Sequence, residues 1–247
     1  FSVAEGQTLG VVGESGSGKS TIGRAILRLL PVLDGSITFD GTDINAYGSR
    51  TPLAYRRQVQ AIFQDPGSSL NPRHLVSQAV ENTLRRHGVS NRNERRKRTA
   101  EAFDMVGLTS DNLRRFPNEL SGGQQQRVAI ARALVLKPRL VVCDEAVSAL
   151  DLSTQGQIIN LLVDLQAETG VSCVFIAHDL GIVRHIAHNV AVMSAGRLVE
   201  LADADSIYDS PKDAYTRRLL EATPASGPDG REERRALRQR ERAEAVS

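Results

Sequence analysis

The sequence predicts an α/β fold: a mostly parallel sheet covered by helices on both faces, with an inserted α-helical subdomain. Short apolar runs alternate with helical stretches along most of the 247 residues, as they do in parallel sheets. The stretch from about 66 to 136 has helical periods, several arginines and no convincing strand. Hydrophobic residues make up 40% of the chain, which is typical of a globular protein with a sizeable core.

The predicted elements follow from these patterns in chain order. We expect strands at Thr8–Val12, Val59–Phe63, Leu140–Cys143, Val171–Ala177 and Asn189–Met193. Alternation combined with turn glycines predicts an edge strand or hairpin at Gly35–Ile44. We expect helices at Ile22–Leu30, Ser77–Arg86, Glu94–Val106 and Leu152–Glu168, and an alanine-rich helix that ends near Leu136.

The stretch Gly13–Thr21, GESGSGKST, lies between the first strand and the first helix, which is the order of a P-loop. Its glycines have no Cβ, so they allow tight turns and bring N–H groups close to phosphate oxygens. The helix N-terminus adds unpaired N–H groups and a positive dipole end. Lys19 can neutralise the β- and γ-phosphates, and the Ser20 hydroxyl suits Mg²⁺. We therefore expect a P-loop NTPase (RecA-like) core that binds a nucleoside triphosphate.

A second segment, Arg139–Glu145 (RLVVCDE), places two carboxylates at the end of a buried strand. Ligands of open α/β sheets bind at the carboxyl ends of the strands. Asp144 is placed to hold Mg²⁺ directly or through water. Glu145 is placed to polarise a water for in-line attack on the γ-phosphate.

A third segment, Leu120–Gln124 (LSGGQ), directly precedes the alanine-rich helix. Ser121 is a good N-cap, and the two glycines leave backbone N–H groups open. This makes a second phosphate-facing helix N-terminus in a chain whose nucleotide needs only one P-loop. We infer that the segment faces the nucleotide of another subunit, so that two copies paired head to tail bury two nucleotides.

Together these segments resemble the ATP-binding cassette subunits of ABC transporters, and the resemblance covers essentially the whole chain before its C-terminal tail. Leu120–Gln124 matches the signature motif of that family. Gly13–Thr21 and Arg139–Glu145 match its Walker A and Walker B motifs.

Three further matches occur in the family's order. Gln64 matches the Q-loop glutamine, which the resemblance implies contacts Mg²⁺ and the attacking water and links to the membrane subunits. Ser148–Asp151 matches the D-loop, which crosses the dimer interface. His178 follows the strand Val171–Ala177 and matches the switch histidine that contacts the γ-phosphate.

The resemblance implies a complete set of site residues for ATP and Mg²⁺. The expected catalytic residues are Glu145, His178, Gln64 and Lys19, and the expected Mg²⁺ ligands are Ser20, Gln64 and Asp144. The residues expected to contact nucleotide are Gly13, Glu14, Ser15, Gly16, Ser17, Gly18, Lys19, Ser20, Thr21, Ser121, Gly122, Gly123, Gln124 and Asp151.

Two stretches resemble the dipeptide, oligopeptide and nickel importer branch of the family. They are Gln64–Arg73, QDPGSSLNPR, and the region from Ile207 to Pro224, which matches a short C-terminal extension. Some relatives carry a cysteine cluster for an iron–sulfur centre in that extension. Because this chain has no cysteine after Cys173, we expect no such cluster. Ala146 stands where this branch usually has proline, and we expect a small effect on the loop and intact catalysis.

The resemblance implies the motor subunit of an importer that hydrolyses ATP to ADP and phosphate to power uptake of peptides or a related small solute. The expected partners are a second ABC ATPase subunit, identical or different, transmembrane permease subunits and, indirectly, an extracellular solute-binding protein. No nucleic acid partner is expected. The expected location is the cytoplasmic face of the cell membrane, reached through the membrane subunits. The sequence does not identify the transported solute.

We expect a single ABC ATPase domain over 1–224. Its core covers about 1–65 and 137–200, its helical subdomain about 66–136, and its C-terminal extension about 201–224. The charged tail 225–247 is expected to be disordered or a solvated helix. We also expect that some natural sequence precedes Phe1, including strands of the small antiparallel subdomain and the aromatic residue that stacks on adenine in the family.

Two alternative functions stay open at this point. One is a soluble, non-transport ABC ATPase that acts on DNA or ribosomes, although the formal charge of +2 provides no general field for nucleic acid. The other is a catalytically weak, nucleotide-binding half of a fused or heterodimeric cassette. The arginines between 85 and 98 favour a solvated helix face over a phosphate or lipid contact. Cys143 and Cys173 lie in apolar runs and are predicted to be buried thiols.

Overall fold

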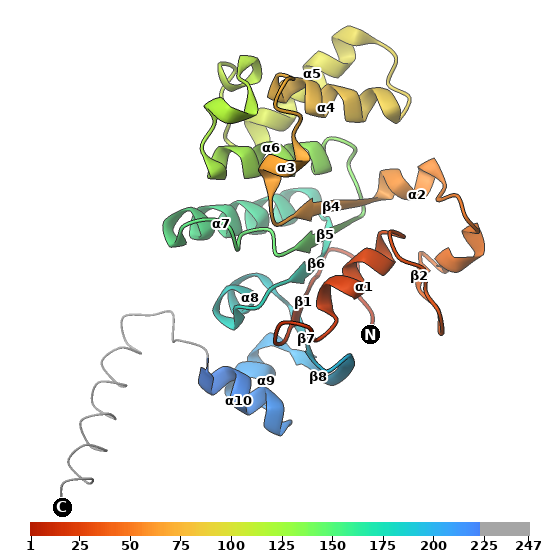
Figure 1. Cartoon of the computed structure of the whole chain (residues 1–247), viewed down its shortest axis with the longest axis vertical. Coiled ribbons are helices and arrows are strands. Elements are labelled where there is room, and N and C mark those ends of the chain that lie inside the picture. Colours follow the sequence, from red (N-terminus) through yellow and green to blue (C-terminus); the bar gives the residue numbers. More distant parts are fainter. Residues whose placement is uncertain (223–247) are drawn as a thin grey trace, which may run out of the picture.

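The computed structural model describes residues 1–222, and its main feature is a six-stranded sheet in the order β4-β5-β6-β1-β7-β8 (Figure 1). All neighbouring strands pair in parallel except β7 and β8, which are antiparallel. The predicted mostly parallel sheet of a P-loop fold is therefore confirmed. The predicted tail 225–247 lies outside the described residues.

The strands of this sheet are β1 Thr8–Val12, β4 Val59–Phe63, β5 Leu140–Asp144, β6 Ser172–Ile176, β7 Asn189–Ser194 and β8 Arg197–Asp203. A separate two-stranded hairpin consists of β2 Thr38–Phe39 and β3 Thr42–Asp43. The five apolar runs expected to form strands do so within one or two residues at each end. β8 was not predicted, because its side chains are mostly half-buried or exposed and give no apolar run.

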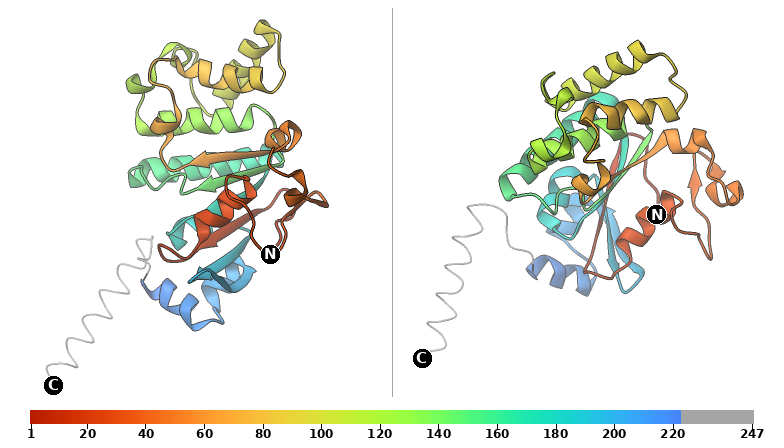
Figure 2. Two further views of the ribbon diagram at one scale, coloured as in Figure 1. Left: turned by 45° about the vertical axis from the view of Figure 1, so that its right-hand side comes forward. Right: turned by 45° about the horizontal axis from the view of Figure 1, so that its top comes forward.

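The helices are α1 Lys19–Ile26, α2 Leu53–Gln58, α3 Pro66–Ser69, α4 Val76–Arg86, α5 Arg92–Met105, α6 Gly122–Leu134, α7 Leu152–Thr169, α8 Leu180–Ile186, α9 Ala204–Asp209 and α10 Ala214–Ala222. Short 3₁₀ turns cover Ile44–Tyr47, Asn112–Arg114 and Pro117–Glu119. Figure 2 shows α3 to α6 stacked beyond one edge of the sheet, with α9 and α10 beyond the other.

The first helix is shorter than the predicted Ile22–Leu30. It ends at Ile26 because Arg28 adopts φ 55° and the amides of Leu29 and Leu30 turn back to the carbonyl of Arg24. Leu29 is 61% exposed, so the apolar pattern beyond Ile26 does not mark a buried helix face. The prediction for this C-terminal end was wrong.

The sheet is buried on both faces by two apolar clusters. Leu9 and Val11 of β1 pack with Ile26 of α1 on one face. Phe175 of β6 packs on the other face, in the cluster that contains residues of α6, α7 and α8. Cys143 and Cys173 are buried free thiols in this second cluster, as predicted.

The basic stretch between 85 and 98 is partly used inside the fold. Arg95 donates to the carbonyls of Val89 and Ser90, and Arg98 donates to the carbonyl of Val135. Lys97 lies 3.9 Å from Glu101 in an exposed pair. The exposed pair agrees with the prediction of a solvated helix face, whereas Arg95 and Arg98 bond main-chain carbonyls of the same subdomain.

Candidate functional site

The loop Gly13–Gly18 joins β1 to α1 at the carboxyl end of the central strand. Gly13 has φ 149°, and a Cβ there would lie 2.1 Å from the carbonyl oxygen of Met193. Gly18 has φ 97° at the N-cap of α1. Only glycine adopts these conformations without strain, so the loop can pass close to β7 and direct its N–H groups outward.

Lys19 is 6% exposed and closes the loop from inside. Its Nζ donates to the carbonyl oxygens of Gly13 at 2.7 Å and Glu14 at 2.8 Å. Burial lowers the pKa of Lys19, while the carboxylates of Glu145 and Asp144 raise it. The result is an ammonium group held at the base of the loop, beside the two carboxylates of β5.

Ser20 in the first turn of α1 meets the end of β5. Its Oγ donates to Oδ1 of Asp144 at 2.8 Å, and Asp144 is only 8% exposed. A hydroxyl and a carboxylate are the oxygen donors that Mg²⁺ prefers in nucleotide sites. The donor set of this pair therefore fits a magnesium ion, which Ser20 and Asp144 would hold.

The neighbouring strands β4, β5 and β6 bring further expected site residues to the same place, the carboxyl ends of the strands. Phe63 pairs with Asp144, and Asp144 pairs with Ile176, so the residues that follow these strands lie next to one another. They are Gln64, Glu145 and, one residue further along, His178. Gln64 and His178 are exposed, whereas Glu145 is half-buried.

Glu145 is held in an uncommon backbone conformation. Its φ is 52°, its N–H donates to the carbonyl of Ile176 at 3.0 Å, and its own carbonyl accepts from Ser148 Oγ at 3.0 Å. A left-handed conformation at a residue other than glycine is typical of functional positions. Glu145 and His178 line one cavity of about 190 Å³ beside the starts of α7 and α8, and a carboxylate at the end of β5 can accept a proton from water.

The signature segment forms a second cluster with the start of α7. Ser121 Oγ accepts from the N–H of Gln124 at 3.3 Å, and the Gln124 side chain accepts from the N–H of Ser121 at 3.0 Å, which is a capping box. A Cβ on Gly123 would lie 2.5 Å from Cγ2 of Thr154. Asp151 caps α7 by accepting from the N–H and Oγ1 of Thr154 at 2.9 and 2.7 Å.

The expected nucleotide residues therefore fall into two groups. The first group lies at the carboxyl ends of the strands. It consists of Gly13, Glu14, Ser15, Gly16, Ser17, Gly18, Lys19, Ser20 and Thr21, together with Gln64, Asp144, Glu145 and His178. The second group lies at the starts of α6 and α7 and consists of Ser121, Gly122, Gly123, Gln124 and Asp151. Figure 1 shows α1 and α6 on different levels of the molecule.

Sequence reasoning missed the residues that contact the glycine loop from the C-terminal part of the chain. Gly196 donates its N–H to the carbonyl of Ser17 at 3.1 Å. The hydroxyl of Tyr215 accepts from the N–H of Glu14 at 3.0 Å. No local pattern predicts a contact between positions 201 residues apart, although Tyr215 lies in the extension noted above.

Comparisons with known proteins agree with this geometry. The sequence profile of the ABC transporter family matches residues 1–148. A glutathione import ATP-binding protein, GsiA, of Salmonella paratyphi A is 46% identical over 237 residues, covering 96% of this chain and 38% of that protein. A putative peptide import ATP-binding protein of Brucella ovis is 46% identical over 238 residues, covering 96% of this chain and 75% of that protein.

Two solved structures share the fold. CbiO1 of Clostridium perfringens, part of the ABC transporter complex cbiONQ, superposes with a TM-score of 0.77 at 29% identity, covering 85% of this chain and 82% of that one. The ATP-binding cassette MJ0796, in a dimeric post-hydrolysis state bound to ADP and phosphate, gives a TM-score of 0.70 at 31% identity, covering 83% of this chain and 88% of that one.

Proposed function

Because the chain belongs to the ABC transporter family, we propose that it is the ATP-binding and ATP-hydrolysing motor subunit of an importer of peptides or a related small solute. The observation that carries this proposal is the meeting of Lys19, Ser20, Asp144 and Glu145 at one edge of the sheet. The similarity to glutathione and peptide import ATP-binding proteins over 96% of the chain supports the direction and class of transport.

In this proposal the glycine loop binds the triphosphate of ATP. The loop amides and the N-terminus of α1 face the phosphate oxygens, and Lys19 balances their negative charge. Ser20 and Asp144, with Gln64 beside them, hold Mg²⁺, which would neutralise charge on the β- and γ-phosphates when it is bound. The 2.8 Å contact between Ser20 and Asp144 supports this assignment, because it already places two hard oxygen donors together.

Glu145 serves as the general base for hydrolysis. It accepts a proton as water attacks the γ-phosphorus in line, and the bond from phosphorus to the β–γ bridging oxygen breaks to leave ADP and phosphate. His178 contacts the γ-phosphate from the end of β6. A shared cavity of about 190 Å³ that both Glu145 and His178 line supports their action at one site.

The signature segment acts on the nucleotide of a second ABC ATPase subunit. Ser121 and Gly122 are exposed at the N-terminus of α6, and Asp151 is exposed at the N-terminus of α7. Facing the glycine loop of another cassette, these groups would complete a site that each chain only half provides. The related cassette MJ0796 is dimeric in its post-hydrolysis state, which supports this pairing.

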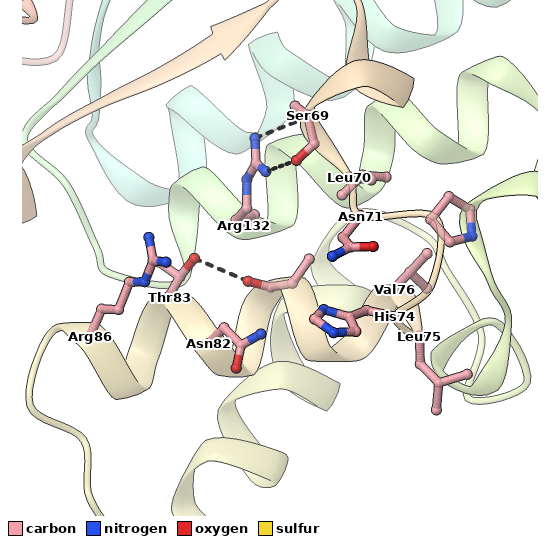
Figure 3. A pocket seen from close by; sticks show the side chains of 12 residues that line it. Ser69, Leu70, Asn71, His74, Leu75, Val76, Asn82, Thr83, Arg86 and Arg132 are labelled. Carbon is pink, nitrogen blue, oxygen red and sulfur yellow. Dashed lines mark hydrogen bonds between the residues drawn. The ribbon is translucent and has the colours of Figure 1, made fainter.

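A groove beside α4 is the proposed docking site for a cytoplasmic segment of a permease subunit (Figure 3). It encloses about 290 Å³, and its polar lining includes Asn71, His74, Asn82 and Arg86. Arg132 of α6 forms one wall and donates to the carbonyl and hydroxyl of Ser69. Because α3 begins two residues after Gln64, a partner in this groove would sense closure of the nucleotide site.

This assignment places the chain at the cytoplasmic face of a membrane through its permease partners. Within residues 1–222, no helix is both long and apolar enough to span a bilayer. We also propose that the extension binds no iron–sulfur cluster, because it offers no cysteine ligand. Cysteine thiolates are the usual ligands of such clusters.

Release of phosphate from ATP by the purified chain, with and without Mg²⁺, tests the proposal. We expect Mg²⁺-dependent hydrolysis that Lys19→Ala abolishes, while the matched control Lys97→Ala, on an exposed face of α5, retains it. Hydrolysis that is independent of Mg²⁺, or unchanged in Lys19→Ala, would refute the assigned site.

A further inference from the structure

The glycine loop is held from outside by the C-terminal part of the described chain. Met193 at the end of β7 lies against Gly13, and Gly196 in the turn before β8 donates to the carbonyl of Ser17. Tyr215 of α10 makes a third contact, from further along the chain. Figures 1 and 2 both show α10 next to β8, on the same side of the molecule as the loop between β1 and α1.

The contact of Tyr215 is a hydrogen bond to the loop backbone. Its hydroxyl oxygen accepts from the N–H of Glu14 at 3.0 Å. Glu14 lies between Gly13, which has φ 149°, and Ser15, in a segment whose side chains are exposed. Glycine-rich backbone has many accessible conformations, so a single fixed amide restricts it strongly.

The main chain that leads into Tyr215 is held by hydrogen bonds at the start of α10. Glu200 of β8 accepts from the N–H groups of Lys212 at 2.8 Å and Asp213 at 3.0 Å. Asp213 Oδ1 accepts from the N–H of Tyr215 at 2.7 Å. Thr216 is fully buried behind it. The docking of α10 on β8 therefore brings Tyr215 to the loop, where its hydroxyl meets the N–H of Glu14.

We propose that Tyr215 is a positioning residue for the nucleotide site, and that the docking of α10 on β8 thereby sets the affinity for ATP. This inference rests on the proposed function. When α10 is docked, the loop is fixed in the form that presents its amides to phosphate. When α10 is displaced, the Glu14 amide loses its partner and ATP must order the loop itself, so binding weakens. Tyr215 touches none of the expected Mg²⁺ ligands or Glu145, so turnover at saturating ATP is retained.

The test compares Tyr215→Phe with Tyr208→Phe by ATP titration and steady-state hydrolysis. Tyr208 is a matched control, because its hydroxyl also bonds the main chain, donating to the carbonyl of Leu180, but lies away from the loop. For Tyr215→Phe we expect the Kd and KM for ATP to rise about two- to tenfold, the range of one hydrogen bond, with kcat unchanged. The control should bind ATP like the unmodified protein.

A second variant and a second readout guard against a merely structural effect. Glu200→Gln weakens the docking of α10 without touching the loop, and it should raise the Kd for ATP in the same direction. Amide hydrogen exchange in the segment 13–18 should quicken in Tyr215→Phe and not in Tyr208→Phe. An unchanged Kd for ATP in Tyr215→Phe, or equal changes in both tyrosine variants, would overturn the inference. Absence of ATP binding in the unmodified protein would instead refute the proposed function.

Discussion

Ser20 Oγ lies 2.8 Å from Oδ1 of Asp144, although 124 residues separate them in the chain. The contact exists because α1 packs across the sheet close to the end of β5. Gly23 of α1 allows this approach, since a Cβ there would lie 2.8 Å from Cδ1 of Ile176 and 3.2 Å from Cγ1 of Val142. The two proposed magnesium donors are thus brought together by helix packing on a parallel sheet.

Removal of the Ser20 hydroxyl should weaken Mg²⁺ binding. We expect Ser20→Ala to raise the Mg²⁺ concentration for half-maximal hydrolysis by about tenfold or more, as for loss of a metal-binding partner. Titration of hydrolysis with Mg²⁺ at fixed ATP measures this. Ser110→Ala, at an exposed site in the helical region, is the control, and an identical Mg²⁺ dependence in both variants would argue against a role for Ser20 in metal binding.

Neutralisation of the proposed base should stop turnover without preventing nucleotide binding. We expect Glu145→Gln to lower kcat by about 10²-fold or more. The loop around it should persist, because Ser148 bonds the main-chain carbonyl of Glu145 and not its carboxylate. The rate of single-turnover ATP hydrolysis measures this loss. Glu168→Gln, on the exposed end of α7, is the control. Turnover within a few-fold of the unmodified protein would exclude Glu145 as the base.

Two glycine substitutions should act in opposite directions. Gly13→Ala places a Cβ 2.1 Å from the carbonyl oxygen of Met193 at φ 149°, so we expect a loss of about 2 to 4 kcal/mol of unfolding free energy and loss of ATP binding. Gly156→Ala lies within α7 with open space around it, so we expect a gain of about 0.5 to 1 kcal/mol. Urea unfolding measures both, and a neutral Gly13→Ala would contradict the loop geometry.

The docking of α10 should depend on the ionisation of Glu200. Burial raises the pKa of Glu200, but the nearby Thr216 hydroxyl, the amides of Lys212 and Asp213 and the Lys212 charge outweigh burial, so the pKa lies below its ordinary value of 4.5. A pKa that is lowered in the folded state means that ionised Glu200 stabilises the fold above pH 4.5. This stabilisation is lost as the pH falls through the folded-state pKa.

Thermal unfolding of the unmodified protein and Glu200→Gln over this acid range tests that dependence. We expect the unmodified protein to be more stable near neutral pH and the difference to shrink below pH 4.5. A difference that stays constant with pH would show that the carboxylate does not contribute through its charge.

Many of the site residues at the carboxyl ends of the strands could be predicted, because the sequence patterns that mark them are local. The strands Val59–Phe63 and Leu140–Cys143 are short apolar runs, and a buried parallel strand needs little more than that. The sequence alone therefore places Glu145 at the end of such a run. The capping role of Ser121 was likewise visible in LSGGQ, since a capping box depends on residues three positions apart.

The remaining features depend on contacts that the local sequence does not encode. Helix α1 ends at Ile26 because of the backbone turn at Arg28, while the apolar pattern continues to Leu30. Within residues 1–222, strand β8 pairs with β7 alone, as the last strand of the sheet, and its faces are too exposed to produce an apolar run. The bond between Glu14 and Tyr215 joins the two ends of the described chain, so only the folded arrangement reveals it.

The central claim is that the glycine loop of one copy and the signature segment of another enclose each ATP. The most direct test is the solution mass of Glu145→Gln with and without Mg-ATP, with Glu145→Gln/Ser121→Arg as control. We expect Glu145→Gln to be a monomer without nucleotide and a dimer with Mg-ATP. We expect Glu145→Gln/Ser121→Arg to stay a monomer, because a bulky cation blocks the interface. A Glu145→Gln protein that binds Mg-ATP and stays monomeric at every concentration would contradict the claim.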